Sequence, residues 1–336
     1  MDLSINYLGL KLKNPLIAGA SAYTADIKKA LELQEAGVAA IVYKSLFEEQ
    51  LNLEAAELED DLHEYDDRNA EMINLFPSIE HSGPKAHLMA LKEFKEALSI
   101  PVIASLNCIY KESWEEYAVH LASTGVDALE LNFYSSISEA DISAESIESE
   151  QVEALKRILK KIKIPVAVKL SPYYTNPLAF IKKLDAVGAS GFVLFNRLFQ
   201  PDINIQSEKL EMPYNLSKDG DSRFSLRYMG LLEGKVKASL CANTGIIEAN
   251  DVIAALLAGA DAVQMVTSLY KKGAKCIPEI LNELSAWMEK KGYSSVAAFK
   301  GKLSKRNLKD PYAYKRAQYV DFLMKSKDYA DKYPVN

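Results

Sequence analysis

The chain has 336 residues, a hydrophobic fraction of 49%, a charged fraction of 26% and a formal net charge of −6 at pH 7. Its length suits one large decorated domain or two ordinary ones, and its composition is typical of a soluble globular protein. The negative charge argues against a nucleic-acid partner. Three scattered cysteines without a CxxC pair exclude a disulfide framework, and they exclude a zinc or iron–sulfur site made by this chain alone. No stretch approaches the roughly 20 apolar residues of a membrane span.

Segment 3–13 contains two β-prone pieces around Leu8-Gly9-Leu10 and predicts a short hairpin. Eight β-prone apolar runs follow, at 14–20, 39–45, 101–107, 128–134, 165–171, 191–196, 237–245 and 262–267. The helices expected in this alternating pattern are 25–35, 85–97, 113–122, 150–161, 177–187, 226–232, 249–258 and 276–290. Eight β–α units indicate an α/β fold, the (β/α)8 or TIM barrel.

Three connections are longer than ordinary barrel loops: the acidic 48–82, the Ser- and Glu-rich 135–149, and 196–223. Long loops after barrel strands commonly form lids over a site, and the polar part of 48–82 is expected to be a solvated helix. Segment 291–336 has no barrel pattern and predicts a helical extension packed outside the barrel. We therefore expect a single domain over 1–336. The amino-terminal residues lack the pattern of a signal peptide, so a cytoplasmic location is expected.

The carboxyl ends of the predicted strands are unusually rich in Asn and Lys, which are poor strand formers. These ends carry Ser21, Lys44, Ser45, Asn107, Asn132, Lys169, Asn196, Asn243, Thr244 and Thr267. Active sites of (β/α)8 barrels lie at this end of the strands. The pattern therefore predicts a polar site there, whereas no metal-ligand spacing is found and no metal is expected.

The ends of the seventh and eighth strands, Asn243-Thr244-Gly245-Ile246 and Val266-Thr267-Ser268, are where many barrels bind phosphate through backbone N–H groups. A glycine in this turn lets the backbone approach a phosphate closely. The pattern fits a phosphorylated substrate or a phosphate-bearing cofactor such as FMN. An ordinary turn glycine and a helix-capping threonine are the alternative.

Lys44 and Lys169 each follow apolar strand residues. Three interpretations are open: a Schiff-base lysine, a cation that stabilises developing negative charge beside a flavin, or a lysine that extends to solvent. The amides of Asn107, Asn132 and Asn196 suit a planar heterocycle such as a pyrimidine, although Asn is also common after strands.

A series of motifs, in the family's order across most of the chain, resembles dihydroorotate dehydrogenase. The motifs are Asn14-Pro15-Leu16-Ile17-Ala18-Gly19-Ala20-Ser21, Val42-Tyr43-Lys44-Ser45, Glu130-Leu131-Asn132, Val168-Lys169-Leu170-Ser171-Pro172, Ala242-Asn243-Thr244-Gly245-Ile246 and Gln264-Met265-Val266-Thr267, with a similar C-terminal stretch at 291–302. The resemblance implies a barrel that binds FMN and oxidises dihydroorotate to orotate, a step of pyrimidine biosynthesis.

The resemblance also implies roles for individual residues. Ser135 corresponds to the catalytic base, which removes a proton from C5 of dihydroorotate while a hydride leaves C6 for N5 of FMN, and Lys44 lies beside the flavin at the reaction centre. The residues implied to bind FMN are Ala20, Ser21, Lys44, Ser45, Asn107, Asn132, Lys169, Thr244, Gly245, Val266 and Thr267. Those implied to bind substrate are Asn74, Asn132, Asn196 and Arg197. A soluble electron acceptor or partner subunit and a homodimer are further family expectations.

The chain departs from the family around the substrate. The Pro and Asn that usually follow the strand-four serine or cysteine are missing from Tyr134-Ser135-Ser136-Ile137, and Arg197 replaces a serine or threonine. The substrate loop is reduced to Ile73-Asn74-Leu75-Phe76-Pro77. Alternatives are therefore an FMN barrel acting on another cyclic amide or anionic substrate, a Schiff-base lyase, and a catalytically silent binding subunit.

Overall fold

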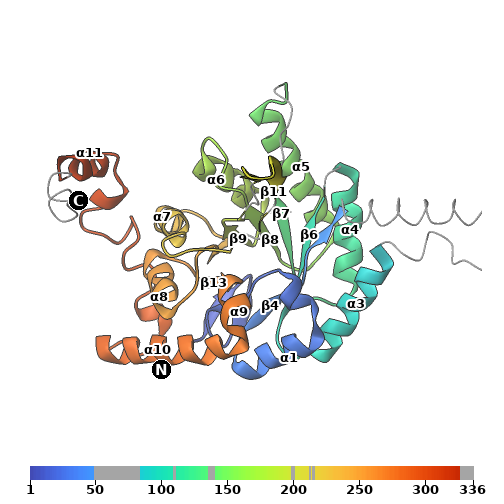
Figure 1. Cartoon of the computed structure of the whole chain (residues 1–336), viewed down its shortest axis with the longest axis horizontal. Helices are drawn as coiled ribbons and strands as arrows, with labels where there is room; N and C mark the ends of the chain where they lie inside the picture. Colours follow the sequence, from blue (N-terminus) through green and yellow to red (C-terminus); the bar gives the residue numbers. More distant parts are fainter. Residues whose placement is uncertain are drawn as a thin grey trace, which may run out of the picture.

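Eight parallel strands close into a barrel in the computed structural model (Figure 1), which describes residues 1–48, 84–108, 111–134, 141–197, 201–211, 213 and 216–325. The barrel strands are β3 (Leu16–Ala18), β4 (Ala40–Val42), β6 (Val102–Asn107), β7 (Ala128–Phe133), β8 (Val166–Leu170), β9 (Gly191–Leu194), β12 (Ser239–Ala242) and β13 (Ala262–Met265). Each strand pairs with its sequence neighbours, and pairing of β13 with β3 and of β4 with β6 completes the ring. The predicted (β/α)8 barrel is confirmed.

Helices surround the strands and bury one apolar face against them. They are α1 (Ile27–Ala36), α3 (Pro84–Ala97), α4 (Lys111–Ser123), α5 (Ala144–Lys161), α6 (Pro177–Val187), α7 (Ser222–Leu232), α8 (Ala249–Ala258), α9 (Thr267–Lys272) and α10 (Cys276–Lys291). Asn176 caps α6, with Pro177 in its first turn, and Gly188 ends it at φ 115°. None of the helices in the described ranges is long and apolar enough to cross a membrane.

Two helices, α5 and α7, begin four or more residues earlier than the sequence predicts. Helix α5 starts six residues ahead of the expected position because Ser143 accepts a hydrogen bond from the Ser146 amide and acts as the N-cap. Helix α7 starts at Ser222 rather than at Leu226. Helix α1 follows a 3-10 turn (Ala22–Ala25) and is capped by Asp26.

The predicted amino-terminal hairpin is formed by β1 (Ile5–Tyr7) and β2 (Leu10–Leu12), and it closes the barrel at its amino-terminal end. Tyr7, Leu8 and Leu12 are buried and belong to one cluster with the alanine and β-branched side chains inside the barrel. Gly191 makes room for the hairpin, since a Cβ there would lie 2.4 Å from Cδ2 of Leu8. This apolar plug leaves the carboxyl end of the barrel as the accessible end.

Three short strands were not predicted: β5 (Leu46–Phe47), which adds to the carboxyl end of β6, and the hairpin β10 (Asp202–Asn204) and β11 (Lys209–Glu211). Beyond α10, the chain runs mainly in turns along α7 and α8, with backbone hydrogen bonds from Gly301 to Leu256 and from Lys305 to Gly230. Up to residue 325, where the described part ends, the extension is helical only in two 3-10 turns (Val296–Ala298 and Tyr312–Tyr314) and in α11 (Ala317–Met324), which Figure 1 shows set apart from the barrel.

Candidate active site

A cavity of about 360 Å³ opens at the carboxyl end of the barrel, the end that the strand-end pattern predicts. Its walls come from the loops after β3, β4, β9, β12 and β13, together with residues inside β7, β8 and β13. The lining residues are Ala20, Ser21, Ala22, Lys44, Ser45, Phe47, Asn132, Lys169, Asn196, Arg197, Leu216, Ser217, Asn243, Thr244, Gly245, Ile246, Gln264, Val266 and Thr267. Most of the residues singled out from the sequence are thereby brought together, and the volume lies in the usual range for small-molecule sites.

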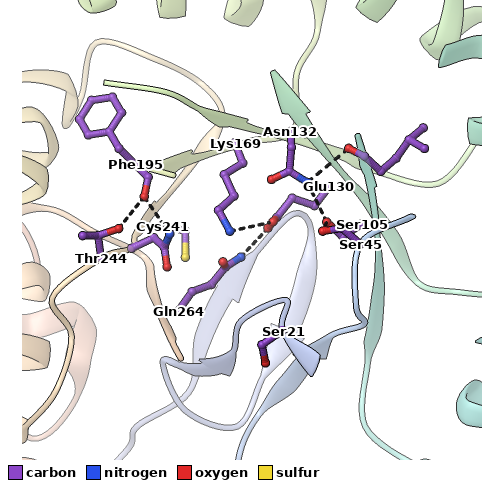
Figure 2. Close-up of polar contacts among 12 residues, drawn as sticks. Ser21, Ser45, Ser105, Glu130, Asn132, Lys169, Phe195, Cys241, Thr244 and Gln264 are labelled. Atoms are coloured by element: carbon purple, nitrogen blue, oxygen red, sulfur yellow. Dashed lines mark hydrogen bonds and ion pairs between the residues drawn. The ribbon is translucent and has the colours of Figure 1, made fainter. Parts of the chain in front are cut away.

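A layer of buried polar side chains lies inside the barrel at the base of this cavity (Figure 2). Lys169 on β8 places its Nζ 3.5 Å from Oε1 of Glu130 on β7. Gln264 on β13 donates from Nε2 to the other carboxylate oxygen of Glu130 at 2.5 Å. The Lys169 side chain is 7% exposed and that of Glu130 is fully buried. Lys169 is therefore a paired cation within the barrel and not a lysine that extends to solvent.

A second polar cluster joins β6, β7 and the loop after β4. The hydroxyls of Ser45 and Ser105 are 2.7 Å apart, and Asn132 donates from Nδ2 to Ser105 at 2.8 Å (Figure 2). With its amide donors engaged, Asn132 keeps its carbonyl oxygen to accept from a ligand in the cavity. The cluster fixes the orientation of two residues predicted to touch the flavin.

The turn after β12 has the close backbone packing expected of a phosphate cradle. Thr244 and Gly245 have φ values of 71° and 76°, and Thr244 Oγ1 donates to the Phe195 carbonyl at 2.9 Å. The Gly245 amide donates to the Ser217 hydroxyl at 3.2 Å, and Thr267 Oγ1 accepts from the Ser217 amide at 3.0 Å. Ser217, which sequence reasoning missed, thus bridges the two turns predicted to hold the phosphate.

Arg197 lies on the rim of the cavity and contacts the loop before α7. Its Nη1 donates to Oδ2 of Asp221 at 2.5 Å, and Nη2 donates to the Leu216 carbonyl at 3.4 Å. Burial works to raise the pKa of Asp221, but hydrogen bonds from the Lys218 amide and from Arg197 outweigh it and lower the pKa. Arg197 also borders a second hollow of about 230 Å³, between Tyr173 and Phe224.

Two buried polar oxygens of cavity-lining residues, a hydroxyl and an amide oxygen, lack hydrogen-bond partners among the described residues. They are Oγ of Ser21 and Oε1 of Gln264. Buried polar atoms are normally hydrogen-bonded, so atoms left unpaired in a cavity indicate a ligand with complementary hydrogen-bonding groups. Together with the Lys169 cation, this donor and acceptor set fits a flavin ring, whose edge alternates N–H and carbonyl groups.

Three predicted residues are not part of the described cavity. Asn107 is buried at the end of β6 but is not among the lining residues, and Ser135 and Asn74 lie outside the described residues. Glu130, Ser105 and Gln264 were not singled out as site residues by sequence reasoning, although two of them lie in motifs that carry the family resemblance. No cluster of three metal-ligating side chains occurs within the described part of the chain.

Comparison with known proteins agrees with the geometry. A family model described as dihydroorotate dehydrogenase matches residues 2–288. The chain is 27% identical over 310 residues to the dihydroorotate dehydrogenase B (NAD(+)) catalytic subunit of Thermoplasma volcanium, covering 91% of this chain and 99% of that relative. It is 24% identical over 317 residues to the protein of the same description from a Geobacillus species, covering 92% and 98%.

Proposed function

The chain belongs to the dihydroorotate dehydrogenase family, and on this premise we propose that it is an FMN-dependent oxidoreductase that oxidises dihydroorotate to orotate. The observation that carries the proposal is one cavity lined by both predicted sets of residues. Ser21, Lys44 and Lys169 come from the flavin set, and Asn196 and Arg197 from the substrate set.

The cofactor would lie across the polar base of the cavity. Lys169 would face the pyrimidine edge of the flavin, and the turns that carry Gly245 and Thr267 would hold its phosphate through backbone N–H and hydroxyl groups. When bound, FMN supplies hydride acceptance at N5. The phosphate would take over the Gly245 amide, whose present partner is the Ser217 hydroxyl.

The substrate residues proposed here are Asn132, Asn196 and Arg197, with Asn74 and Ser135 from segments outside the described residues. Asn132 presents its carbonyl oxygen to a ring N–H, because its amide nitrogen is held by Ser105. Ser135 would accept the C5 proton through a water or backbone relay, since a serine hydroxyl is a weak base by itself. Loss of that proton and of a hydride from C6 leaves the C5–C6 double bond of orotate.

A related anionic or cyclic-amide substrate is the second candidate, and Arg197 favours it. A guanidinium at this rim would pair with a substrate carboxylate if it exchanged Asp221 for the ligand. A Schiff-base lyase fits less well, since such a lysine reacts as the neutral amine whereas Lys169 is in an ion pair with Glu130.

The electron acceptor is proposed from the relatives. Those compared above are described as catalytic subunits of an NAD(+) enzyme. We therefore propose that a partner subunit or a soluble oxidant reoxidises the flavin. A homodimer and a cytoplasmic location are proposed on the family resemblance alone, and light scattering of the purified protein would test the former.

The test is an anaerobic titration of the purified, FMN-loaded protein with dihydroorotate, followed by the visible absorbance of the flavin. Bleaching that is lost in Ser135→Ala while FMN stays bound would support the activity and its base. A yellow protein that does not bleach would favour another substrate, to be sought among carboxylates and tested with Arg197→Met. A protein that cannot be loaded with FMN would refute the proposal.

A further inference from the structure

Glu130 has no part in the proposed reaction, yet it is a fully buried carboxylate at the base of the cavity. A charge removed from water is costly unless it is paired and hydrogen-bonded. Figure 2 shows both conditions: Lys169 approaches one carboxylate oxygen, and Gln264 donates to the other. Three strands thus converge on this one carboxylate, which calls for a reason beyond packing.

Two other titratable groups that interact with Glu130, Tyr7 and Cys241, are uncharged. Burial raises the pKa of Tyr7 well above its ordinary value, with further contributions from Cys241 and Glu130. Burial likewise raises the pKa of Cys241, and the Glu130 charge adds to that shift. Both groups therefore carry their protons at neutral pH. Among the described residues, the cation facing Glu130 is Lys169, and the two charges offset each other.

We propose that Glu130 is a positioning residue that acts through Lys169. Its carboxylate fixes the ammonium at the base of the cavity and reduces the positive charge that a bound flavin experiences, while Gln264 orients the carboxylate. The inference rests on the proposed binding of FMN. It assigns the ion pair a role in setting the reduction potential of the cofactor.

The direction of the effect follows from electrostatics. Uptake of two electrons and one proton gives a reduced flavin with a net negative ring charge, and an unpaired cation beside the ring favours that form. A cation already paired with a carboxylate favours it less. Removal of the Glu130 charge should therefore make the midpoint potential more positive. A tenfold gain in the preference for reduced over oxidised FMN corresponds to about 30 mV for a two-electron couple.

The experiment is a spectroelectrochemical titration of FMN bound to Glu130→Gln, which keeps the shape and removes the charge. Glu130→Asp keeps the charge and controls for packing. Glu233→Gln is the matched charge control, because Glu233 follows α7 at the opposite end of the barrel and contacts Ser304. For Glu130→Gln we expect the preference for reduced over oxidised FMN to rise at least tenfold, which makes the midpoint potential more positive. For the two controls we expect potentials close to that of the unsubstituted protein.

An unchanged or more negative potential in Glu130→Gln, with FMN bound, would overturn the inference and leave the proposed function intact. The same shift in Glu233→Gln would also overturn it, since the effect would then be general. If Glu130→Gln does not fold, Glu130→Ser is the second neutral variant, with room for a water beside Lys169. Failure of the unsubstituted protein to bind FMN would remove the proposed function, and this inference with it.

Discussion

The Glu130–Lys169 pair predicts a large loss of stability when only one partner is removed. Lys169→Met should leave the Glu130 carboxylate buried beside a thioether with no counter-charge. At 3.5 Å the Coulomb attraction is about 5 kcal/mol for an effective dielectric constant of about 20. Measured losses for broken buried pairs are about 3–5 kcal/mol, so we expect Lys169→Met to lower the free energy of unfolding by that amount.

The double variant Glu130→Gln/Lys169→Met removes the pair as a whole and should recover most of the loss, because no unpaired charge stays buried. The matched control is Lys95→Met. The Lys95–Asp127 contact is shorter, at 2.6 Å, but its side chains are 23% and 29% exposed, so its removal should cost about 1 kcal/mol or less.

Urea unfolding of the cofactor-free protein, followed by circular dichroism, measures all of these free energies under one condition. Lys169→Met must lose clearly more stability than Lys95→Met, and the double variant must be more stable than Lys169→Met. The single variant Glu130→Gln completes the comparison. If the losses in Glu130→Gln and Lys169→Met simply add up to the loss in the double variant, the residues do not act as a pair and the electrostatic reasoning fails.

Three further predictions concern the turns and the rim. Gly191→Ala should destabilise the protein by about 1–3 kcal/mol in urea, since its Cβ would overlap the amino-terminal hairpin, and should leave FMN affinity unchanged. Gly245→Ala should weaken FMN binding at least tenfold in a fluorescence titration, because φ is 76° and the Cβ would lie 2.2 Å from the Ser222 amide nitrogen. The pKa of Asp221 is lowered, so its contact with Arg197 stabilises the fold above pH 3.8, the ordinary pKa of an aspartate. This contribution is lost as the pH falls further. In thermal unfolding measured across this pH range, Asp221→Asn should lose this part of the pH-dependence.

The strand-end rule located the rim of the site and Lys169, but not Glu130 and Gln264 in the layer beneath the rim. All eight barrel strands, and the surrounding helices in the described ranges except α9, follow from apolar runs and their terminators. Parallel strands are apolar on both faces. A single polar residue within such a strand is therefore not readily recognised from the sequence as part of a site. The signal was present in β7, where Leu129 and Leu131 alternate with Glu130 and Asn132. Residues two apart share a face, which places Glu130 directly below Asn132.

Other differences from expectation arise where local hydrogen bonds override composition. The Ser- and Glu-rich stretch before α5 resembles a loop by composition, but Ser143 caps a helix there and Glu145 adds a favourable charge to its first turn. The β10–β11 hairpin has exposed Ile203 and Leu210 alternating with polar residues, a pattern too short to identify before its pairing is known. Ser217 could not be linked to Thr267 from sequence, since fifty positions separate them.

The charges of Glu130 and Lys169 lie between the hairpin plug at the amino-terminal end of the barrel and the cavity at its carboxyl end. This placement explains why they matter for function. The hairpin plug fills the amino-terminal end with the buried side chains of Tyr7 and Leu8, which shields that end from solvent. Charges in the layer above are then poorly screened and interact strongly with whatever occupies the cavity. Glu130 and Lys169 offset each other's charge, whereas the oxygens of Ser21 and Gln264 have no hydrogen-bond partner among the described residues. The same apolar plug that stabilises the fold therefore makes the polar layer a strong and specific contact surface for a ligand.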